Sequence, residues 1–231
     1  DERDFPLYTF NTDDDTGDKI EPLFMVPIIP MVLVNDSKDC MGTGYSSTIY
    51  SYNVRDIIDI LKQKLNSNYD HEELVPFYNN FIGSIVMNED KRSCECTGIY
   101  TIDNEKNMIT ITELPLFTWT TVYKTNVLLK TDALKKKKML GDHIVDIVEK
   151  HGNNVHFEIY LNPKTLNLST LSEEEIISTF KLRMRMNFTN MHAWNIENRI
   201  TKYESSMDIL NEFYDVRLHY YNLRKEHMLL S

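Results

Sequence analysis

The sequence predicts an α+β fold in which a mixed antiparallel sheet with flanking helices leads into a long C-terminal coiled-coil helix. Alternating apolar and polar residues at Ile109–Thr112 and Val155–Leu161 are typical of half-buried strands. Ser172 and Glu175 have the spacing of a helix capping box. From Ser205–Leu230, apolar residues recur at steps of three and four, which predicts one helix with a heptad seam.

Length and composition fit one or two compact domains. With 231 residues, 42% of them hydrophobic, the chain can bury a sizeable core. Its longest apolar stretch, Phe24–Val34, contains two prolines and is shorter than the roughly 20 residues of a membrane span, so we predict no membrane segment. The first residues are Asp-Glu-Arg-Asp, without a signal peptide or a starting methionine, and we therefore expect an internal fragment of a longer protein.

Four segments are expected before the strands. Residues 1–20 are polar and rich in aspartate, which indicates a loop or arm. Pro22–Val34 is apolar but broken by prolines, which exclude a helix interior and favour a buried extended segment. Asn35–Tyr52 is rich in Asn, Asp, Ser and Gly, as in a loop, and Arg55–Leu65 has the apolar spacing of a short helix.

The middle of the chain is expected to alternate strands with helices. Residues 77–161 have mainly strand character, with a hairpin turn at Asp103–Glu105. Two stretches within this part, Trp119–Leu134 and Leu140–Lys150, have a composition that favours helices. The capping box then predicts a helix from Glu173 to about Phe180.

The charge is acidic but unevenly distributed. A net charge of −10, if spread evenly, would argue against a nucleic-acid partner, because such binding depends on neutralising phosphates. Acidic residues crowd Asp13–Asp18, where a solvated loop is favoured over a metal site. Basic residues gather at Lys135–Lys138, which we interpret as a solvated turn, and at Lys181, Arg183 and Arg185.

Short motifs do not predict a metal site, a nucleotide site or an independent hydrolase. Cys40, Cys94 and Cys96 form an odd set, which favours reduced structural thiols over a zinc site. Gly42 and Gly44 lack the third glycine of a dinucleotide fingerprint and open no helix directly. The chain contains no Gly-x-Ser-x-Gly and no His-Glu-x-x-His.

One stretch resembles a known family. Its parts are Glu21-Pro22, Val26–Asn35, Met41–Ser46 and Ile49, and they look like the run E-P, P-I-I-P-M-V-L-x-N-G, G-T-G-W-S and I-P of type IIA DNA topoisomerases of the eukaryotic kind. Similar pieces follow in the same order along nearly the whole chain, at Ser51–Ile57, Phe77–Gly83, Ile111–Pro115, Thr118–Lys124, Phe180–Leu182, Asn190–His192 and Asp208–Lys225.

The resemblance implies three segments and a parent enzyme. The segments are the end of a winged-helix DNA-gate region (1–52), a tower domain (53–200) and the start of a coiled-coil stem (201–231). The parent would be a homodimer that cuts double-stranded DNA through paired tyrosines with Mg²⁺ and passes a second duplex with ATP. We expect a nuclear parent, and a viral parent acting in an infected cell stays open.

The chain lacks the family's catalytic motifs. It contains neither the Arg-Tyr pair that carries the nucleophile nor the Glu-Gly-Asp-Ser signature of the metal domain. We therefore expect no catalytic residue and no cofactor within it. Lys202-Tyr203 stands where the family has a structural Lys-Tyr, so that tyrosine is expected to pack rather than react.

The resemblance also implies roles in DNA binding. Ile49 matches the isoleucine that wedges between base pairs in this family; such a wedge costs a few kcal/mol of unstacking, which a bent duplex repays by meeting more protein surface. Tyr50 stands in place of the family's proline and would be able to stack on an unstacked base or sugar. We expect phosphate contacts from Lys38, Arg55, Lys181, Arg183 and Arg185.

Three further departures bear on this prediction. Asp36 replaces a family glycine, Lys38–Cys40 replaces a shorter turn with one extra residue, and Phe117 replaces an arginine. These changes and the acidic charge keep a second hypothesis open, in which the chain is a non-catalytic scaffold or interaction module derived from the tower domain.

Overall fold

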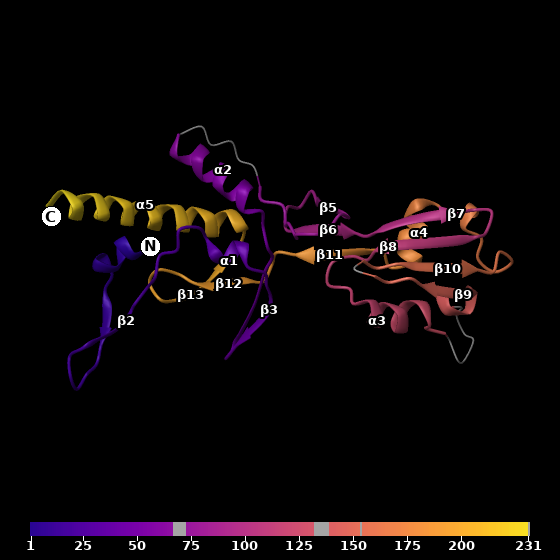
Figure 1. Cartoon of the computed structure of the whole chain (residues 1–231), viewed down its shortest axis with the longest axis horizontal. Coiled ribbons are helices and arrows are strands. Elements are labelled where there is room, and N and C mark those ends of the chain that lie inside the picture. Colours follow the sequence, from indigo (N-terminus) through magenta and orange to yellow (C-terminus); the bar gives the residue numbers. More distant parts are fainter. Residues whose placement is uncertain (67–72, 132–138, 153, 231) are drawn as a thin grey trace. The chain divides into compact units, whose positions relative to one another are not determined.

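The computed structural model describes residues 1–66, 73–131, 139–152 and 154–230. The chain forms two compact units: unit 1 comprises Asp1–Tyr78 and Asn187–Ser231, and unit 2 comprises Asn79–Met186 (Figure 1). This division differs from the three segments that the sequence suggested. The described residues of 53–78 and 187–200 belong to unit 1, and the boundaries of the three segments stay predictions.

The α+β prediction is confirmed in both units. The elements of unit 1 are η1 (Glu2–Leu7), β1 (Phe10–Thr12), β2 (Lys19–Pro22), α1 (Met31–Val34), β3 (Ser37–Gly42), β4 (Tyr45–Ile49), α2 (Val54–Leu65), β12 (Met191–Trp194), β13 (Ile200–Tyr203) and α5 (Ser206–Leu230). Those of unit 2 are β5 (Ser84–Met87), β6 (Ser93–Thr97), β7 (Ile99–Asp103), β8 (Met108–Glu113), α3 (Thr120–Tyr123), η2 (Lys124–Leu128), η3 (Leu140–His143), β9 (Ile144–Glu149), β10 (Phe157–Leu161), η4 (Leu168–Thr170), α4 (Glu173–Thr179) and β11 (Arg183–Asn187).

Unit 2 is built on a four-stranded antiparallel sheet in the order β7-β8-β10-β9 (Figure 1). The predicted hairpin is confirmed as β7 and β8. The alternation of β8 and β10 places Ile109 and Ile159 opposite each other, and both are fully buried. Tyr123 belongs to the buried core of this unit, where its hydroxyl donates a 2.6 Å hydrogen bond to the carbonyl of Phe180.

The capping box is confirmed at the start of α4. The Glu175 amide donates to Ser172 Oγ at 3.3 Å, and the Ser172 amide donates to Glu175 Oε2 at 2.8 Å. The helix ends at Thr179 with Phe180 as its C-cap, close to the predicted end at about Phe180, and the next residue, Lys181, has a φ of +53°. A left-handed residue at this point is a common way to end a helix.

A second sheet of unit 2 holds the strands by which the chain enters and leaves it. The order is β11-β6-β5. The first strand of unit 2 and the last are therefore separated by one intervening strand. Unit 2 is in this sense an insertion into unit 1.

Unit 1 is organised around α5, the predicted C-terminal helix (Figure 1). Its first turns bury Ile209 and Leu210. Further along, the buried positions are Arg217 and Arg224, whose guanidinium groups both bind the fully buried carboxylate of Asp4 in η1. The two arginines are seven residues apart and therefore lie on the same face of the helix.

Asp4 and the two arginines form a buried ionic cluster. Arg217 Nη1 lies 2.7 Å from Asp4 Oδ2, and Arg224 Nε lies 2.9 Å from Asp4 Oδ1. Asp1 adds a second carboxylate 3.2 Å from Arg224. The Tyr221 ring covers both cations, at 4.1 Å from Arg217 and 5.2 Å from Arg224. The cluster fixes the N-terminal segment to the C-terminal helix.

Two predicted helices are wrong in part. Leu140–Lys150 begins with a short 3-10 turn, but its second half is strand β9, because its β-branched residues pair with β10. Of the predicted helix Trp119–Leu134, the structure describes the residues up to 131, and among these α3 and the π-helical turn η2 are helical, as far as Leu128. The basic run Lys135–Lys138 lies outside the described residues.

The N-terminal predictions also need correction. The expected arm forms η1 and the β1–β2 hairpin, whose turn is stabilised by Asp13 accepting from the Asp15 and Thr16 amides, both at 2.8 Å. The expected extended segment ends in the helical turn α1, because Pro30 stands at its N-cap, where a missing N–H costs nothing. The segment is also only partly buried, since Met25 is 70% exposed.

Candidate nucleic-acid interface

The stretch predicted as the loop 35–52 is a β-hairpin, formed by β3 and β4. Gly42 pairs with Tyr45 across a two-residue turn, in which Gly44 has a φ of +85° that glycine adopts without strain. The tip projects apolar and aromatic groups into solvent, with Met41 88% exposed and Tyr45 53% exposed. The prediction of a loop failed because polar residues dominate the strands of this hairpin.

The extra residue in this hairpin, relative to the family run, is accommodated by a local irregularity. The register of β3 shifts between Ser37 and Cys40 relative to β4, and Asp39 within that shift has a φ of +54°. Asp36, which stands in place of a family glycine, accepts a 3.0 Å hydrogen bond from the Tyr78 hydroxyl. Burial, together with the Asp36 carboxylate, raises the pKa of Tyr78 above its ordinary value. Both departures are thus absorbed into the packing of unit 1.

Ile49, the predicted wedge, ends β4 and is buried, with 1% of its surface exposed. The expectation that it lies on an open loop is therefore wrong. In this structure it faces the interior of the protein, so a side chain that enters DNA would first have to leave its packing. The wedge role remains a prediction, now with that condition.

Tyr50 is buried as well, at 5% exposure. Its ring meets the edge of the Phe188 ring, with the centroids 5.7 Å apart. Stacking on a base would require this aromatic pair to separate. The residues that follow are also fixed, because Ser51 Oγ donates to the Val34 carbonyl and the Tyr52 amide donates to the Leu33 carbonyl, both at 2.8 Å.

Two of the predicted phosphate contacts lie in unit 1. Lys38 is partly exposed and pairs with the adjacent Asp39. Arg55 is exposed in the first turn of α2, whose N-cap is Asn53, and makes no ion pair with any residue in the described part of the chain. Arg55 is thus the cation of this pair that is open to an incoming phosphate.

The other three candidates lie at the end of unit 2. Arg183 forms two 2.9 Å bonds to Glu174, and this carboxylate raises the pKa of the guanidinium. Arg185 binds Asp90 at 3.0 Å and Ser93 at 2.8 Å. Lys181 is exposed and forms no ion pair within the ranges that the structure describes. Acidic partners therefore occupy the two arginines of this group.

Several residues that position the hairpin were not predicted as functional. The Thr48 amide donates to the Asn190 carbonyl at 2.7 Å, Asn190 Nδ2 donates to Ser46 Oγ at 3.0 Å, and the His192 amide donates to Ser47 Oγ at 3.0 Å. Asn190 and His192 were visible only as one of the short pieces of the family resemblance. Their distance from β4 in the sequence gave no local signal of this contact.

Comparison with known proteins identifies the chain. The sequence model that describes the A-type subunit of DNA gyrase/topoisomerase IV matches residues 1–231. The chain belongs to this family. It is 35% identical over its whole length to the mitochondrial DNA topoisomerase 2 of Dictyostelium discoideum, and 37% identical over 98% of its length to DNA topoisomerase 2 of Penicillium chrysogenum. It spans 17% and 14% of the lengths of these two relatives.

A solved structure shows the same fold. It is the DNA-binding, cleavage and re-ligation domain of Plasmodium falciparum topoisomerase II, with a TM-score of 0.81 and 34% identity. The match covers 99% of this chain and 30% of that one. The predicted resemblance to type IIA topoisomerases of the eukaryotic kind is confirmed.

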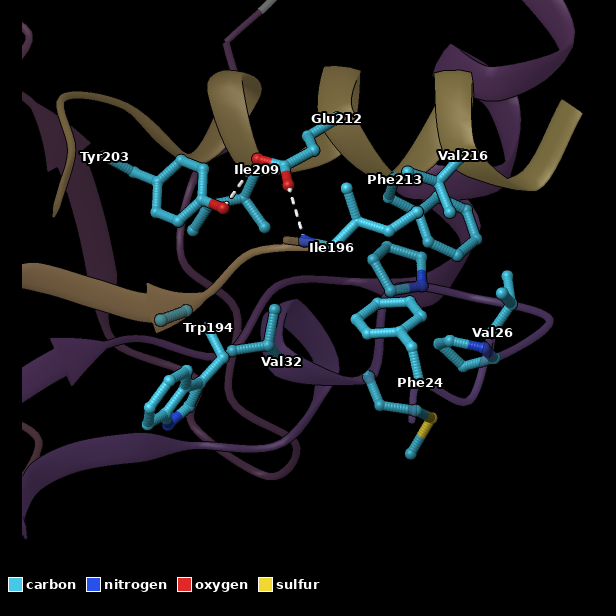
Figure 2. A pocket seen from close by; sticks show the side chains of 14 residues that line it. Phe24, Val26, Val32, Trp194, Ile196, Tyr203, Ile209, Glu212, Phe213 and Val216 are labelled. Atoms are coloured by element: carbon cyan, nitrogen blue, oxygen red, sulfur yellow. Dashed lines mark hydrogen bonds between the residues drawn. The ribbon is translucent and has the colours of Figure 1, made fainter. Parts of the chain in front are cut away.

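The chain also has an apolar cleft of about 400 Å³ next to α5 (Figure 2). Phe24 and Phe213 face it, and Glu212 lies at its upper edge, where it accepts from the Tyr203 hydroxyl at 2.6 Å and from the Ile196 amide at 3.4 Å. Tyr203 is 8% exposed, and burial raises the pKa of its hydroxyl. Tyr203 therefore has the packing role that the sequence predicted for the Lys-Tyr pair.

The three cysteine thiols of the chain form no disulfide. Cys94 and Cys96 are fully buried in β6, and burial raises their pKa to about 12 and about 11, so both stay protonated at neutral pH. Among the described residues, no group of three or more His, Cys, Asp or Glu side chains could hold a metal ion. No helix in the same ranges is long and apolar enough to cross a membrane.

Proposed function

We propose that the chain is the DNA-binding and DNA-bending part of the breakage-reunion core of an ATP-dependent type II DNA topoisomerase. One observation carries the proposal: 99% of the chain superimposes on a domain described as DNA-binding, cleaving and re-ligating, at 34% identity. The whole enzyme would relax and decatenate DNA by double-strand passage. It would do so in the nucleus as a homodimer.

In this proposal, catalysis belongs to other parts of the enzyme. The sequence lacks the Arg-Tyr pair and the metal-domain signature of the family, so the nucleophilic tyrosine, Mg²⁺ and ATP would act outside these residues. The chain itself would grip and shape the duplex. Its sequence preference would come from how easily a base step deforms, with little reading of base edges.

The residues would divide these tasks. Ile49 would wedge between base pairs, and Tyr50 would follow it toward the unstacked base. Arg55 and Lys181 would bind phosphates directly, because both are exposed without an ion pair in the described ranges. Lys38, Arg183 and Arg185 would have to exchange a carboxylate for a phosphate.

Duplex binding and bending test the proposal. We would titrate a 30-base-pair duplex with a donor and an acceptor dye at its ends, in about 50–200 mM salt, and record anisotropy and energy transfer together. We expect affinity to fall steeply with salt, and Arg55→Ala to reduce the logarithmic salt slope by about 1. Arg199→Ala is the matched control, because Arg199 is exposed, pairs with Glu197 and is not a predicted contact.

A second candidate function is a scaffold that kept the fold and lost DNA bending. The net charge of −10, the carboxylate partners of Arg183 and Arg185, and the burial of Ile49 favour it. A scaffold predicts no salt-dependent duplex binding and no change in energy transfer. That outcome would contradict the DNA-bending proposal.

A further inference from the structure

We infer that Asn190 and Phe188 are positioning residues that hold Ile49 inside unit 1, so that the wedge is sheathed until DNA releases it. The inference rests on the proposed function. It adds residues that no DNA contact would identify, because neither is basic and neither has to touch the duplex. They would set how readily the chain bends DNA.

The segment before Ile49 is fixed by the Asn190–His192 segment. Asn190 takes part in two bonds: its carbonyl accepts from the Thr48 amide at 2.7 Å, and its Nδ2 donates to Ser46 Oγ at 3.0 Å. The His192 amide adds a third bond, to Ser47. Three consecutive residues of β4 are therefore held by one stretch near the start of β12.

The segment after Ile49 is fixed independently. Phe188 packs against Tyr50 and is itself 6% exposed. Ser51 and Tyr52 are bonded to the carbonyls of α1. Ile49 is 1% exposed and lies between two anchored segments. We therefore expect that exposing its side chain requires at least one of these segments to move. In the segment before Ile49, the bonds that would have to break are those of β4 to the Asn190–His192 segment.

Sheathing would couple bending to an opening step. If only a small fraction of molecules have Ile49 exposed, the measured affinity for bent DNA is reduced by that fraction. A change that weakens the sheath without touching Ile49 should therefore tighten binding to bent DNA. A residue that merely stabilises the fold would not have this effect.

The test uses the intact chain and the same doubly labelled duplex. Asn190→Ala and Ser46→Ala each remove the hydrogen bond between these two side chains, and Thr189→Ala is the control, because Thr189 is exposed and adjacent. We expect the first two variants to bend DNA with about fivefold lower Kd, and the double variant to gain no more than either single one. Thr189→Ala should match the wild type.

Phe188→Leu keeps an apolar side chain and removes the ring contact with Tyr50, and it should also lower the Kd.

Hydrogen exchange gives a second measurement that does not depend on a variant folding. The Thr48 amide should be protected in the free chain and should exchange faster when bent duplex is bound, whereas the Ile159 amide in unit 2 should not change. Two results would contradict the positioning role of Asn190 and Phe188 and leave the proposed function intact. One is DNA bending while the Thr48 amide stays protected; the other is folded variants that bend DNA no better than wild type. A wild-type chain that does not bend DNA would overturn the proposed function, and the sheath with it.

Discussion

The two units bury polar groups in opposite ways. Unit 2 surrounds the neutral amide of Asn107 with backbone partners: its Nδ2 donates to the carbonyls of Leu161 and Leu166 at 3.0 and 2.9 Å, and its Oδ1 accepts from the Leu168 amide at 2.9 Å. Unit 1 instead buries a carboxylate between two guanidinium groups, at Asp4, Arg217 and Arg224.

This difference determines how the stability of each unit responds to pH and to the loss of one partner. An amide that is satisfied by the backbone keeps its bonds at any pH. A buried ionic cluster stabilises only while every member stays charged and in place, and the loss of one partner leaves an uncompensated charge in the interior. Arg217 already has two buried nitrogens, Nε and Nη2, without a hydrogen-bond partner. Unit 1 should therefore be the more sensitive of the two.

The largest effect should come from Asp4→Ala. It leaves Arg217 and Arg224 buried without their shared carboxylate, and we expect the free energy of unfolding to fall by about 3–5 kcal/mol in urea denaturation. Glu204→Ala, which removes the exposed partner of Lys202, should cost less than about 1 kcal/mol. Similar costs for the two variants would mean that burial does not distinguish these ion pairs.

The corresponding change in unit 2 is Asn107→Ala. It removes the acceptor of the Leu168 amide and the donor to two carbonyls, and we expect a loss of about 1–3 kcal/mol. Asn107 has a φ of +47°, so Asn107→Gly serves as a second variant that relieves backbone strain and still loses the bonds. Asn104→Ala, at an exposed position of the same turn, is the control. If Asn107→Gly were as stable as wild type, strain rather than hydrogen bonding would explain the alanine result.

The third prediction concerns acid. Burial by itself would raise the pKa of Asp4, but the hydrogen bonds and charges of Arg224 and Arg217 outweigh it and hold the pKa below its ordinary value. The unfolded pKa is about 4, so the stabilisation is complete above that pH and is lost as the pH falls through the lower folded value, at no more than about 1.4 kcal/mol per pH unit. The stability difference between wild type and Asp4→Asn, measured from urea midpoints at several pH values, should be constant near neutral pH and shrink below about pH 4. A difference that grew in acid would contradict this assignment.

The smallest effect on stability is expected at the exposed N-cap of α4. Ser172→Ala removes the cap of α4, and thermal denaturation should show a loss of about 1 kcal/mol. Ser178→Ala, at an exposed position within the same helix, should change stability by a few tenths of a kcal/mol, since serine is only slightly worse than alanine there. If Ser172→Ala and Ser178→Ala lowered the stability equally, the capping box would not contribute to it.

Local sequence signals predicted the elements that depend on neighbouring residues and missed those that depend on distant ones. The capping box at Ser172 and the hairpin around Asp103–Glu105 need only neighbouring residues, and both are confirmed. Leu140–Lys150 was misassigned because the strand β9 exists through its pairing with β10. Asp4 carries no local signal at all, since its partner Arg217 lies 213 positions away.

The same reasoning explains what was predicted of the site. The resemblance drew attention to Ile49 and to the hairpin that contains it, but it predicted neither the burial of Ile49 nor the bond from the adjacent Thr48 amide to Asn190, far along the chain. Arg183 and Arg185 were chosen for their charge, and their pairing with Glu174 and Asp90 could be known only from the packing of unit 2. The type of each candidate side chain was readable from the sequence, but the sequence did not predict whether that side chain is exposed and free of an acidic partner.

The insertion of unit 2 has a consequence for how the chain is made. Unit 2 is continuous, and all its strands are synthesised before α5. Asp4, by contrast, pairs with Arg217, which is 213 residues later in the chain. At a synthesis rate of about 5–20 residues per second, Arg217 is made roughly 10–40 s after Asp4. During that interval the carboxylate and the apolar side chains of unit 1 have no helix to pack against. Nascent unit 1 should therefore stay incompletely packed for longer than unit 2, and we expect chaperones to bind it preferentially.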